Sequence, residues 1–299
     1  MLRSIVAVLN HKKVVPLVFL IPFLTIFVLF KVYPVILAVI MSFQNFQGIT
    51  SQEWVGLTNY ENVFELVRFN QALANTTIYT IGTLLILIPL PLILAVLLDS
   101  GRVVQSTVFR TLIFLPALTS LVVAGTVFRL ILAEDGFLNL FLSSTFGIQP
   151  QRWLEISNLS LPSLILVATW RWTGINILYF NSGLVNIPRE LYEAAVIDGA
   201  NAFQMFWRIT LPLLRPTTLF VIVLSIIGGF QVFVEPFILY TGGGGPGDGG
   251  LTMALLIYRT AFTSFNFGTA AAMGVILAGI ILVFSLIQFR FFGTFGREE

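Results

Sequence analysis

Six stretches of this chain are long and apolar enough to cross a lipid bilayer as helices. A membrane-spanning helix needs about 20 predominantly apolar residues. The stretches are 14–43, 76–98, 108–132, 161–183, 217–240 and 269–292. Only 10% of the 299 residues are charged, whereas a soluble domain carries about 25%. The chain therefore lacks the polar surface of a soluble protein, and we predict an all-α integral membrane protein with six transmembrane helices.

The scarce charged and reactive side chains exclude several functions. A net charge of +2 is too small for the electrostatic footprint of a nucleic-acid binder. The chain has no cysteine, and His11 is its single histidine. Because zinc centres and histidine-based nucleophilic sites need such residues, we expect no catalytic residue and no metal site.

The first apolar stretch follows Arg3, Lys12 and Lys13, as the core of a signal peptide would. Its apolar run exceeds the ~7–15 residues of such a core, and no small-residue cleavage site closes it. We therefore expect an uncleaved first span.

Basic residues set the expected orientation, because cytoplasmic loops are enriched in Lys and Arg. With the amino terminus inside, the outer segments hold Arg68, Arg152 and Arg259. The inner segments hold Arg3, Lys12, Lys13, Arg102, Arg110, Arg189, Arg208, Arg215, Arg290 and Arg297. We expect both termini in the cytoplasm.

No internal repeat or linker divides the chain. We expect a tail, first span and outer loop over 1–70, a membrane domain of five helices over 71–292 and a cytoplasmic tail over 293–299.

The long inner segment, 186–216, has the pattern of two short helices. Pro188 opens the first, and Gly199 breaks it where a backbone without a Cβ can turn sharply. Pro212 and Pro216 are expected to end the second helix. Its apolar side carries Phe203, Phe206, Trp207 and Leu211. These residues alone allow two interpretations, a docking element for another protein or an interfacial loop anchored among lipid headgroups.

The same segment resembles the hallmark loop of the membrane subunits of bacterial ATP-binding-cassette importers. That pattern is Glu-Ala-Ala, three residues, Gly, nine residues, Ile, one residue, Leu-Pro. The matching positions are Glu193, Ala194, Ala195, Gly199, Ile209, Leu211 and Pro212. The resemblance implies a type I importer permease fold whose coupling helix lies in this loop. It also implies that Glu193 contacts a separate ATPase and that Gly199 supplies the turn, with Asp198 in the same coupling loop.

Further matches are similar to the carbohydrate-uptake branch of these importers. They are Tyr33-Pro34, Gly56 to Tyr60, Tyr192, Ile197 to Ala200, Phe206 to Ile209, and Thr241 followed by Gly244-Gly245-Pro246. The Gly-Gly-Pro element is typical of the maltose-type first permease. The resemblance covers about 16–291, and it departs at Glu235, where Asp is usual, and in lacking that subunit's extra amino-terminal spans and large outer domain.

The resemblance implies several partners and a location. They are a second, homologous permease, two ATP-binding subunits that hold ATP and Mg, an extracytoplasmic solute-binding protein, and a sugar. The location is a bacterial or archaeal cytoplasmic membrane.

ATP hydrolysis is not expected in this chain itself. A phosphate loop of the type G-x-x-x-x-G-K-[ST] places a lysine after a glycine, and none of the lysines here follows one. Gly245, Gly247 and Gly250 match G-x-G-x-x-G, but no strand is expected before them. A glycine-rich hinge or docking loop is the better interpretation.

Three residues are the main charged candidates inside the predicted spans, where such side chains usually face a cavity or the bundle interior, and Arg129 lies near an outer span end. Lys31 lies near a span end and can extend toward the headgroups. Arg171 stands between Trp170 and Trp172, and aromatic faces with planar polar groups suit a sugar. An aromatic belt with Arg171 on lipid headgroups is the alternative. The third is Glu235.

The candidate substrate pathway combines the fourth and fifth spans. Similarity to the maltose-type permease places Ala168, Arg171, Trp172 and Ile175 in the binding segment, and Asn176 and Tyr179 follow on the same helix. The fifth span adds Gly228, Gln231 and Glu235. Gln231 and Glu235 are four residues apart and are expected to face one cavity. Glu235 could instead pair with Arg171, and the sequence leaves this open.

Three functions remain open at this point. The first is a permease subunit of an ATP-driven sugar importer that works by alternating access. The second is the same architecture for another solute, such as glycerol phosphate, a polyol or a compatible solute, which Arg171 would allow. The third is a stand-alone channel or secondary transporter, for which we find no convincing relay of charges, inverted repeat or paired broken helices.

Overall fold

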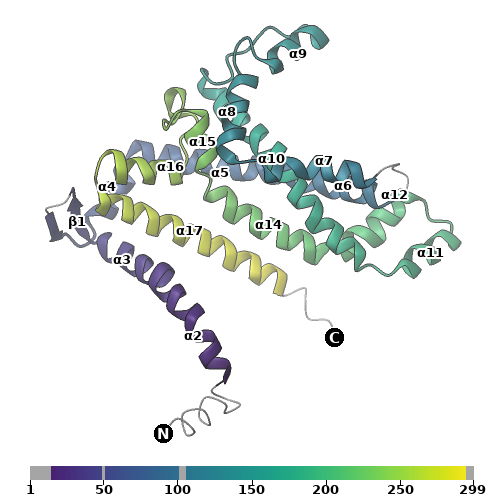
Figure 1. The fold of residues 1–299 in the computed structure, drawn as a ribbon, viewed down its shortest axis with the longest axis horizontal. Helices are drawn as coiled ribbons and strands as arrows, with labels where there is room; N and C mark the ends of the chain where they lie inside the picture. Colours follow the sequence, from purple (N-terminus) through teal and green to yellow (C-terminus); the bar gives the residue numbers. More distant parts are fainter. Residues whose placement is uncertain (1–14, 49–50, 101–105, 294–299) are drawn as a thin grey trace. The chain divides into compact units, whose positions relative to one another are not determined.

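The computed structural model describes residues 15–48, 51–100 and 106–293. The described residues form helices and one two-stranded hairpin (Figure 1). Several residues used for the orientation lie outside the described residues, namely Arg3, Lys12, Lys13, Arg102 and Arg297, and so does His11. Contacts divide the chain into two units, 1–65 with 257–276 and 66–256 with 277–299.

The first unit opens with a continuous apolar helix. It comprises α2 (Val15–Phe27), a π-helical turn η1 (Val28–Val32) and α3 (Tyr33–Met41). The part Phe19–Met41 is long and apolar enough to cross a membrane, and its side chains are almost all exposed. A surface of this kind suits lipid or another membrane helix, and it agrees with the predicted first span.

A buried asparagine ties the rest of the first unit together. After α3 come β1 (Gln44–Gln47), its antiparallel partner β2 (Ser51–Trp54) and α4 (Thr58–Glu65). Asn59 donates from Nδ2 to the carbonyls of Ser42 and Gln44, each at 2.9 Å. The hydroxyl of Thr269 donates to Asn59 Oδ1 at 3.3 Å. Asn59, within the motif from Gly56 to Tyr60, therefore fixes the carboxyl end of the first helix.

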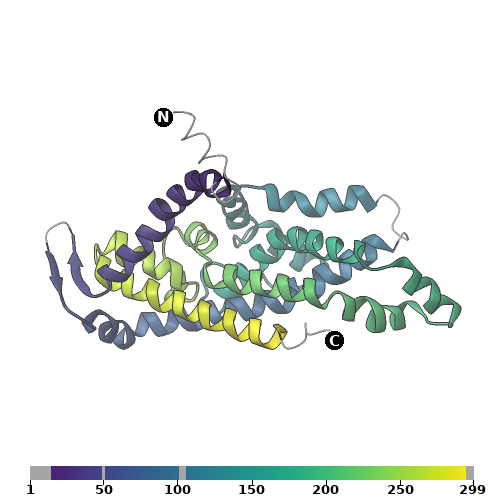
Figure 2. The ribbon, with the colours of Figure 1, turned by 90° about the horizontal axis from the view of Figure 1, so that it is seen from below.

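The second unit is organised around the long helix α10 (Ser157–Val185). It packs against α5 (Val67–Leu87), α6 (Pro89–Asp99) and α7 (Ser106–Leu118), as Figures 1 and 2 show. The approach to α7 depends on Gly174, since a Cβ there would collide with the carbonyl oxygen of Ile113. Two buried apolar clusters lie along α10, one including Leu164 and Val167 and the other Ile177 and Phe180.

Prolines leave backbone carbonyls without a helical partner, and side chains replace the missing bonds. Pro91 has no N–H to donate to the carbonyl of Leu87, four residues earlier. Asn176 Nδ2 of α10 donates to that carbonyl at 2.9 Å. Pro236 likewise frees the carbonyl of Val232, which accepts from the hydroxyl of Thr252 at 2.8 Å. Buried backbone groups need such partners, above all where water is excluded.

The remaining helices of the second unit are short or bent. The third predicted span is broken into α7 and α8 (Leu121–Ile131), which meet at 99°. The segment between the third and fourth predicted spans forms α9 (Phe137–Phe146). The fifth predicted span divides into α14 (Arg215–Phe230) and α15 (Val234–Leu239). The chain continues through η3 (Pro246–Asp248), α16 (Met253–Tyr258), η4 (Arg259–Thr263) and α17 (Phe267–Gly293). The end of α16, all of η4 and the first part of α17 belong to the first unit.

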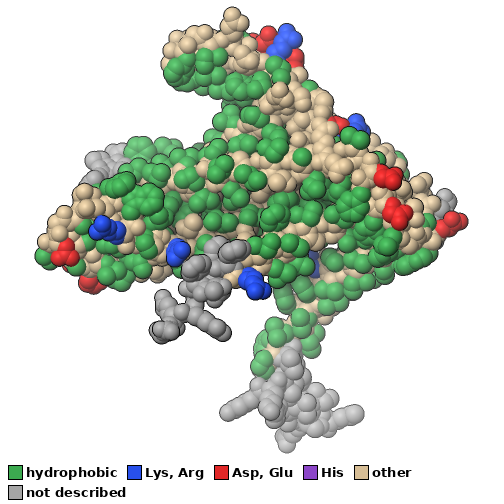
Figure 3. All heavy atoms as spheres, turned by 180° about the vertical axis from the view of Figure 1, so that it is seen from behind, with side chains coloured by type: hydrophobic (Ala, Val, Ile, Leu, Met, Phe, Trp, Pro, Cys, Tyr) green, Lys and Arg blue, Asp and Glu red, His purple; other side chains and the backbone are tan. Residues whose placement is uncertain are grey.

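The expected count of six spans is met only in part. Among the described residues three helices are long and apolar enough to cross a membrane, or up to five if each bent pair is one span. Helix α10 has 29 residues but is not among these helices. Its Trp, Thr and Asn side chains and Arg171 lower its mean hydropathy. Hydrophobic side chains nevertheless cover most of the face drawn in Figure 3, and charged ones are scattered. A multi-pass membrane protein of mostly helical structure follows, and six spans stay a prediction.

Candidate functional site

The inner segment folds as two helical pieces around Gly199, as predicted. Helix α11 (Arg189–Ile197) ends before Gly199, whose φ of +78° lies in the left-handed region. Asn201 and Gln204 then form a capping box, each side chain accepting from the other residue's backbone N–H at 2.9 Å. The sharp turn and the new helix start are therefore both encoded locally.

The end of the second helix differs from the expectation. After α12 (Ala202–Met205), a π-helical turn η2 (Phe206–Thr210) leads into α13 (Leu211–Leu213). Pro212 does not end the helix, because it occupies the first turn of α13, where a missing N–H costs little. The direction instead changes by 65° between Leu213 and Arg215, where α14 begins. The inner loop is thus continuous with α14 through one bend.

The inner loop presents most of its predicted contact residues at the surface. Glu193, Ala194, Asp198, Gly199 and Pro212 are exposed, and Ala195, Ile209 and Leu211 are half-buried. Two apolar side chains beside them are strongly exposed, Ile197 at 86% and Phe203 at 71%. The loop also encloses a hollow of about 330 Å³ lined by Ala195, Asp198, Gly199, Ala200, Gln204, Met205, Arg208 and Ile209. An exposed apolar surface of this kind is typical of a docking site.

A single hydroxyl pair joins the two halves of the inner loop. The hydroxyls of Tyr192 in α11 and Thr210 in η2 are 2.9 Å apart and hydrogen-bonded. Thr210 is buried. The contact links the two helical pieces, and Tyr192, Phe206 and Ile209 also pack against the same buried cluster.

In the membrane part, the side chain of Arg171 binds the backbone at the bend between α7 and α8. Its Nη1 donates to the carbonyl of Thr119 at 2.6 Å, just after the last residue of α7. A cation at the carboxyl end of a helix is favourable for the helix dipole and the unpaired carbonyls. The guanidinium also lies 5.6 Å from the ring centroid of Trp172, a cation–π contact. Its buried Nε has no hydrogen-bond partner in the part of the chain that the structure describes.

Glu235 is buried at 7% exposure on the short helix α15. Trp172 and Arg171 both lie near enough to its carboxyl group to interact with it. No ion pair within 4.0 Å joins Arg171 and Glu235 in the described part of the chain. The pairing left open by the sequence is therefore not made here, although both charges share one neighbourhood with Trp172.

The prediction that Gln231 and Glu235 face one cavity from the same helix is wrong. Helix α14 ends at Phe230, and the chain is not helical from Gln231 to Phe233. Gln231 is exposed whereas Glu235 is buried. The physical cause is Pro236, which cannot donate to the carbonyl of Val232 and so interrupts the helix just before α15.

The other predicted pathway residues have mixed positions. Ala168 is buried near Tyr79, Ile175 is half-buried, and Asn176 is occupied by the Leu87 carbonyl. Tyr179 packs edge-on against Phe220 at 5.3 Å. Gly228 is exposed with free space around it, and its neighbour Gly229 allows close approach of Thr80 on α5.

Sequence reasoning missed Tyr79 of α5, which lies close enough to Glu235 to interact electrostatically. It is buried in the cluster that contains Ala168. A stripe of Thr76, Thr80 and Thr83 on the same helix could have marked α5 as facing the interior, because polar side chains at helical spacing do so in a membrane.

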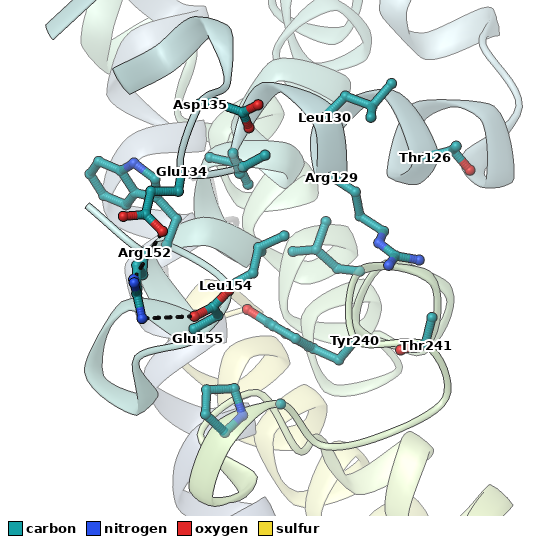
Figure 4. A pocket seen from close by; sticks show the side chains of 16 residues that line it. Thr126, Arg129, Leu130, Glu134, Asp135, Arg152, Leu154, Glu155, Tyr240 and Thr241 are labelled. Carbon is teal, nitrogen blue, oxygen red and sulfur yellow. Dashed lines mark ion pairs between the residues drawn. The ribbon is translucent and has the colours of Figure 1, made fainter. Parts of the chain in front are cut away.

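A larger hollow of about 720 Å³ was also missed (Figure 4). Its walls are the end of α8, the turn at 152–155 and the segment 239–246. Arg152 pairs there with Glu134 at 3.0 Å and Glu155 at 3.6 Å. The three walls are separate segments of the sequence, so no sequence signal connects the motif at Thr241 with Arg152 and its partners.

The glycine-rich segment beside this hollow is held firmly by α5. Arg68 Nε pairs with Asp248 at 2.8 Å, and Gln71 Nε2 donates to the carbonyl of Gly247 at 2.7 Å. Asn75 Nδ2 donates to the carbonyls of Asp248 and Leu251. Of the two interpretations of this segment, these contacts favour a fixed docking loop over a hinge. Among the described residues, no cluster of three or more His, Cys, Asp or Glu is placed to hold a metal ion.

Comparisons with known proteins agree with this architecture. The chain is 44% identical over 289 residues to the arabinooligosaccharides transport system permease protein of Bacillus subtilis, covering 96% of this chain and 91% of that protein. It is 34% identical to the lactose transport system permease protein of Rhizobium radiobacter, covering 91% of each. A bacterial ABC transporter chain involved in the import of alginate has a similar fold, with a TM-score of 0.80, 24% identity and coverage of 93% of this chain and 94% of that chain. The family model of binding-protein-dependent transport system inner membrane components matches residues 3–292. The chain therefore belongs to this family of membrane transport subunits, beside the permeases of sugar importers.

Proposed function

We propose that this chain is a membrane permease subunit of an ATP-driven sugar importer and that it forms the translocation pathway by alternating access. The observation that carries the proposal is the exposed inner loop, where Glu193, Asp198 and Gly199 lie beside exposed apolar side chains on a chain of the binding-protein-dependent family. Its relatives that carry arabinooligosaccharides and lactose support a sugar as the solute.

The complete transporter would contain several other chains. They are a second, homologous permease, two ATP-binding subunits that hold ATP and Mg, and an extracytoplasmic solute-binding protein. This subunit would itself hydrolyse nothing. Both termini would lie in the cytoplasm, which places the inner loop on the side of the ATPase.

The geometry supplies a route for the movement. The inner loop continues directly from α10 and passes through the 65° bend into α14. Because the Tyr192–Thr210 hydrogen bond joins its two halves, a displacement by the ATPase would move both helix ends together. Helix α10 carries Arg171 and Trp172, and α14 leads through the break at Gln231 to Glu235 on α15.

The test compares two acidic residues of α11 in the assembled transporter. Glu193→Lys reverses the charge at the coupling position, and Glu190→Lys makes the same change at an exposed site of the same helix outside the motif. We expect Glu193→Lys to lose co-purification of the ATPase and ATP-dependent uptake of arabinobiose, and Glu190→Lys to retain both.

Two results would contradict the proposal. Downhill transport by the purified chain alone would make it a channel or secondary transporter. Uptake of glycerol 3-phosphate without uptake of arabino-, malto- or galacto-oligosaccharides would keep the importer but replace the sugar.

A further inference from the structure

The 720 Å³ hollow has a wall built by one buried asparagine. Asn139, 2% exposed, donates from Nδ2 to the carbonyls of Ala133, Glu134 and Gln151. Its Oδ1 accepts from the backbone N–H of Gln151 at 3.0 Å and from the indole N–H of Trp153 at 2.9 Å. One side chain thus holds the end of α8 against the turn at 152–155.

The opposite wall is fixed as well. The hydroxyl of Tyr240 donates to the carbonyl of Ser160 at 3.0 Å, and Gly245 and Gly250 leave room for its ring. The glycine-rich segment that follows is clamped to α5 through Asp248, as described above. The hollow is therefore formed in advance, and no adjacent loop has to move to create it.

Two charged side chains that line the hollow have no side-chain partner among the described residues. Arg152 is occupied by Glu134 and Glu155, whereas Arg129 and Asp135 make no side-chain hydrogen bond or ion pair. Figure 4 shows the Arg129 guanidinium extending toward the Thr241 segment, across the hollow from the Arg152 ion pairs. A free guanidinium and a free carboxylate offer planar donors and acceptors of opposite charge.

The volume of the hollow and the charges that line it indicate which class of ligand it can bind. Ligand pockets have volumes of about 300–1,000 Å³, with apolar walls and a few polar groups that fix orientation. Carboxylate and guanidinium groups can each engage two neighbouring hydroxyls. Because the free charges are of opposite sign, a neutral polyhydroxylated molecule fits better than an ion.

The hollow is close to the residues proposed for the membrane pathway. Leu239, one of its lining residues, is four residues after Glu235 on α15, about 6 Å along the helix axis. The ring of Phe128, one residue before Arg129, packs against Trp170 of α10 at 5.2 Å. We propose that this hollow binds the trailing units of an oligosaccharide whose leading unit is in the pathway near Arg171 and Glu235. The inference rests on the proposed function and adds a selection for longer sugars.

The direct test uses the absence of cysteine from the chain. Thr126→Cys places a single thiol on the hollow, and Ser144→Cys places a matched thiol on exposed α9 outside it. With the purified chain in nanodiscs, we expect arabinopentaose to slow maleimide labelling at 126 at least about threefold and to leave labelling at 144 unchanged. Adding Arg129→Ala or Asp135→Asn should abolish this protection. Equal labelling at 126 with and without arabinopentaose, or protection that survives both substitutions, would overturn the proposal.

A second arm measures uptake by the complete transporter. In Arg129→Ala and Asp135→Asn we expect the KM for arabinopentaose to rise at least about fivefold and that for arabinobiose to change less than twofold, with Glu61→Gln on α4 as the control. Equal losses for both sugars would identify the hollow as a docking surface for the binding protein and overturn the proposal. If the unmodified transporter carries no oligosaccharide of the arabino, malto or galacto series, the proposed function fails, and the labelling arm still decides whether the hollow binds the sugar.

Discussion

The turn at Gly199 allows the coupling role of the inner loop to be tested through backbone conformation alone. A Cβ built at Gly199 meets no atom within 4 Å, so a substitution creates no clash within the chain. The φ of +78° is disfavoured for other residues by roughly 1–2 kcal/mol. Asparagine tolerates this region better than alanine, and β-branched valine tolerates it least.

The strain converts into a measurable loss of ATPase affinity. If the ATPase binds the loop only with this turn formed, 1–2 kcal/mol lowers the affinity by about 5–30-fold. We expect Gly199→Asn to bind nearly as tightly as the unmodified chain, Gly199→Ala to lie in this range and Gly199→Val to be weaker still. The assay is titration of the ATP-binding subunit onto the permease in nanodiscs, together with ATP-driven uptake.

A second glycine provides the control. Gly147 follows α9 with φ +67° and also has nothing within 4 Å of a built Cβ, so Gly147→Val creates the same strain on the predicted outer side. It should leave ATPase affinity unchanged. The reasoning is refuted if Gly199→Val binds like the unmodified chain, or if Gly199→Asn is as weak as Gly199→Val, since the loss would then come from surface contact and not from the turn.

Three further substitutions address the membrane part, each measured by thermal unfolding in detergent, where 1 kcal/mol corresponds to roughly 2–4 °C in Tm. Gly174→Ala should destabilise by about 1–3 kcal/mol, because its Cβ meets the α7 backbone, whereas Gly228→Ala, with free space, should not. Asn176→Ala should lower the free energy of unfolding by about 1–3 kcal/mol, because it leaves the Leu87 carbonyl unpaired. The control Asn186→Ala, at an exposed position, should lower it by less than about 0.5 kcal/mol. Arg171→Ala should lower both the Tm and sugar uptake, because it removes a charged donor from Thr119; lost uptake at an unchanged Tm would place Arg171 in the substrate path without a structural role.

Features encoded by neighbouring residues could be predicted from the sequence. The turn at Gly199 needs one residue without a Cβ, and the first span is a continuous apolar run, so both were readable directly. The break in the fifth span could be predicted in part. Pro236 indicates an interrupted helix, but the sequence does not show that the interruption extends back to Gln231. The continuation of the helix through Pro212 was missed, because it depends on the π-helical turn before it.

Features that depend on distant partners could not be read. Arg171 binds a backbone carbonyl 52 residues away. Because every residue has a backbone carbonyl, no residue type in the sequence marks the partner of Arg171. Tyr79 lies close to Glu235 only because α5 and α15 fold into the same unit. Asn139 resembles any polar residue of an outer segment until its three carbonyl partners are known. Periodicity predicts which face of a helix is buried, but not which helix covers it.

The replacement of proline-freed hydrogen bonds by side chains has a consequence for biosynthesis. The bond from Asn176 to the Leu87 carbonyl closes across 89 residues, whereas that from Thr252 to the Val232 carbonyl closes across 20. When α5 and α6 first leave the ribosome, the segment that completes them has not been translated. The Leu87 carbonyl therefore needs water or a temporary partner until α10 has been made and has packed against α6.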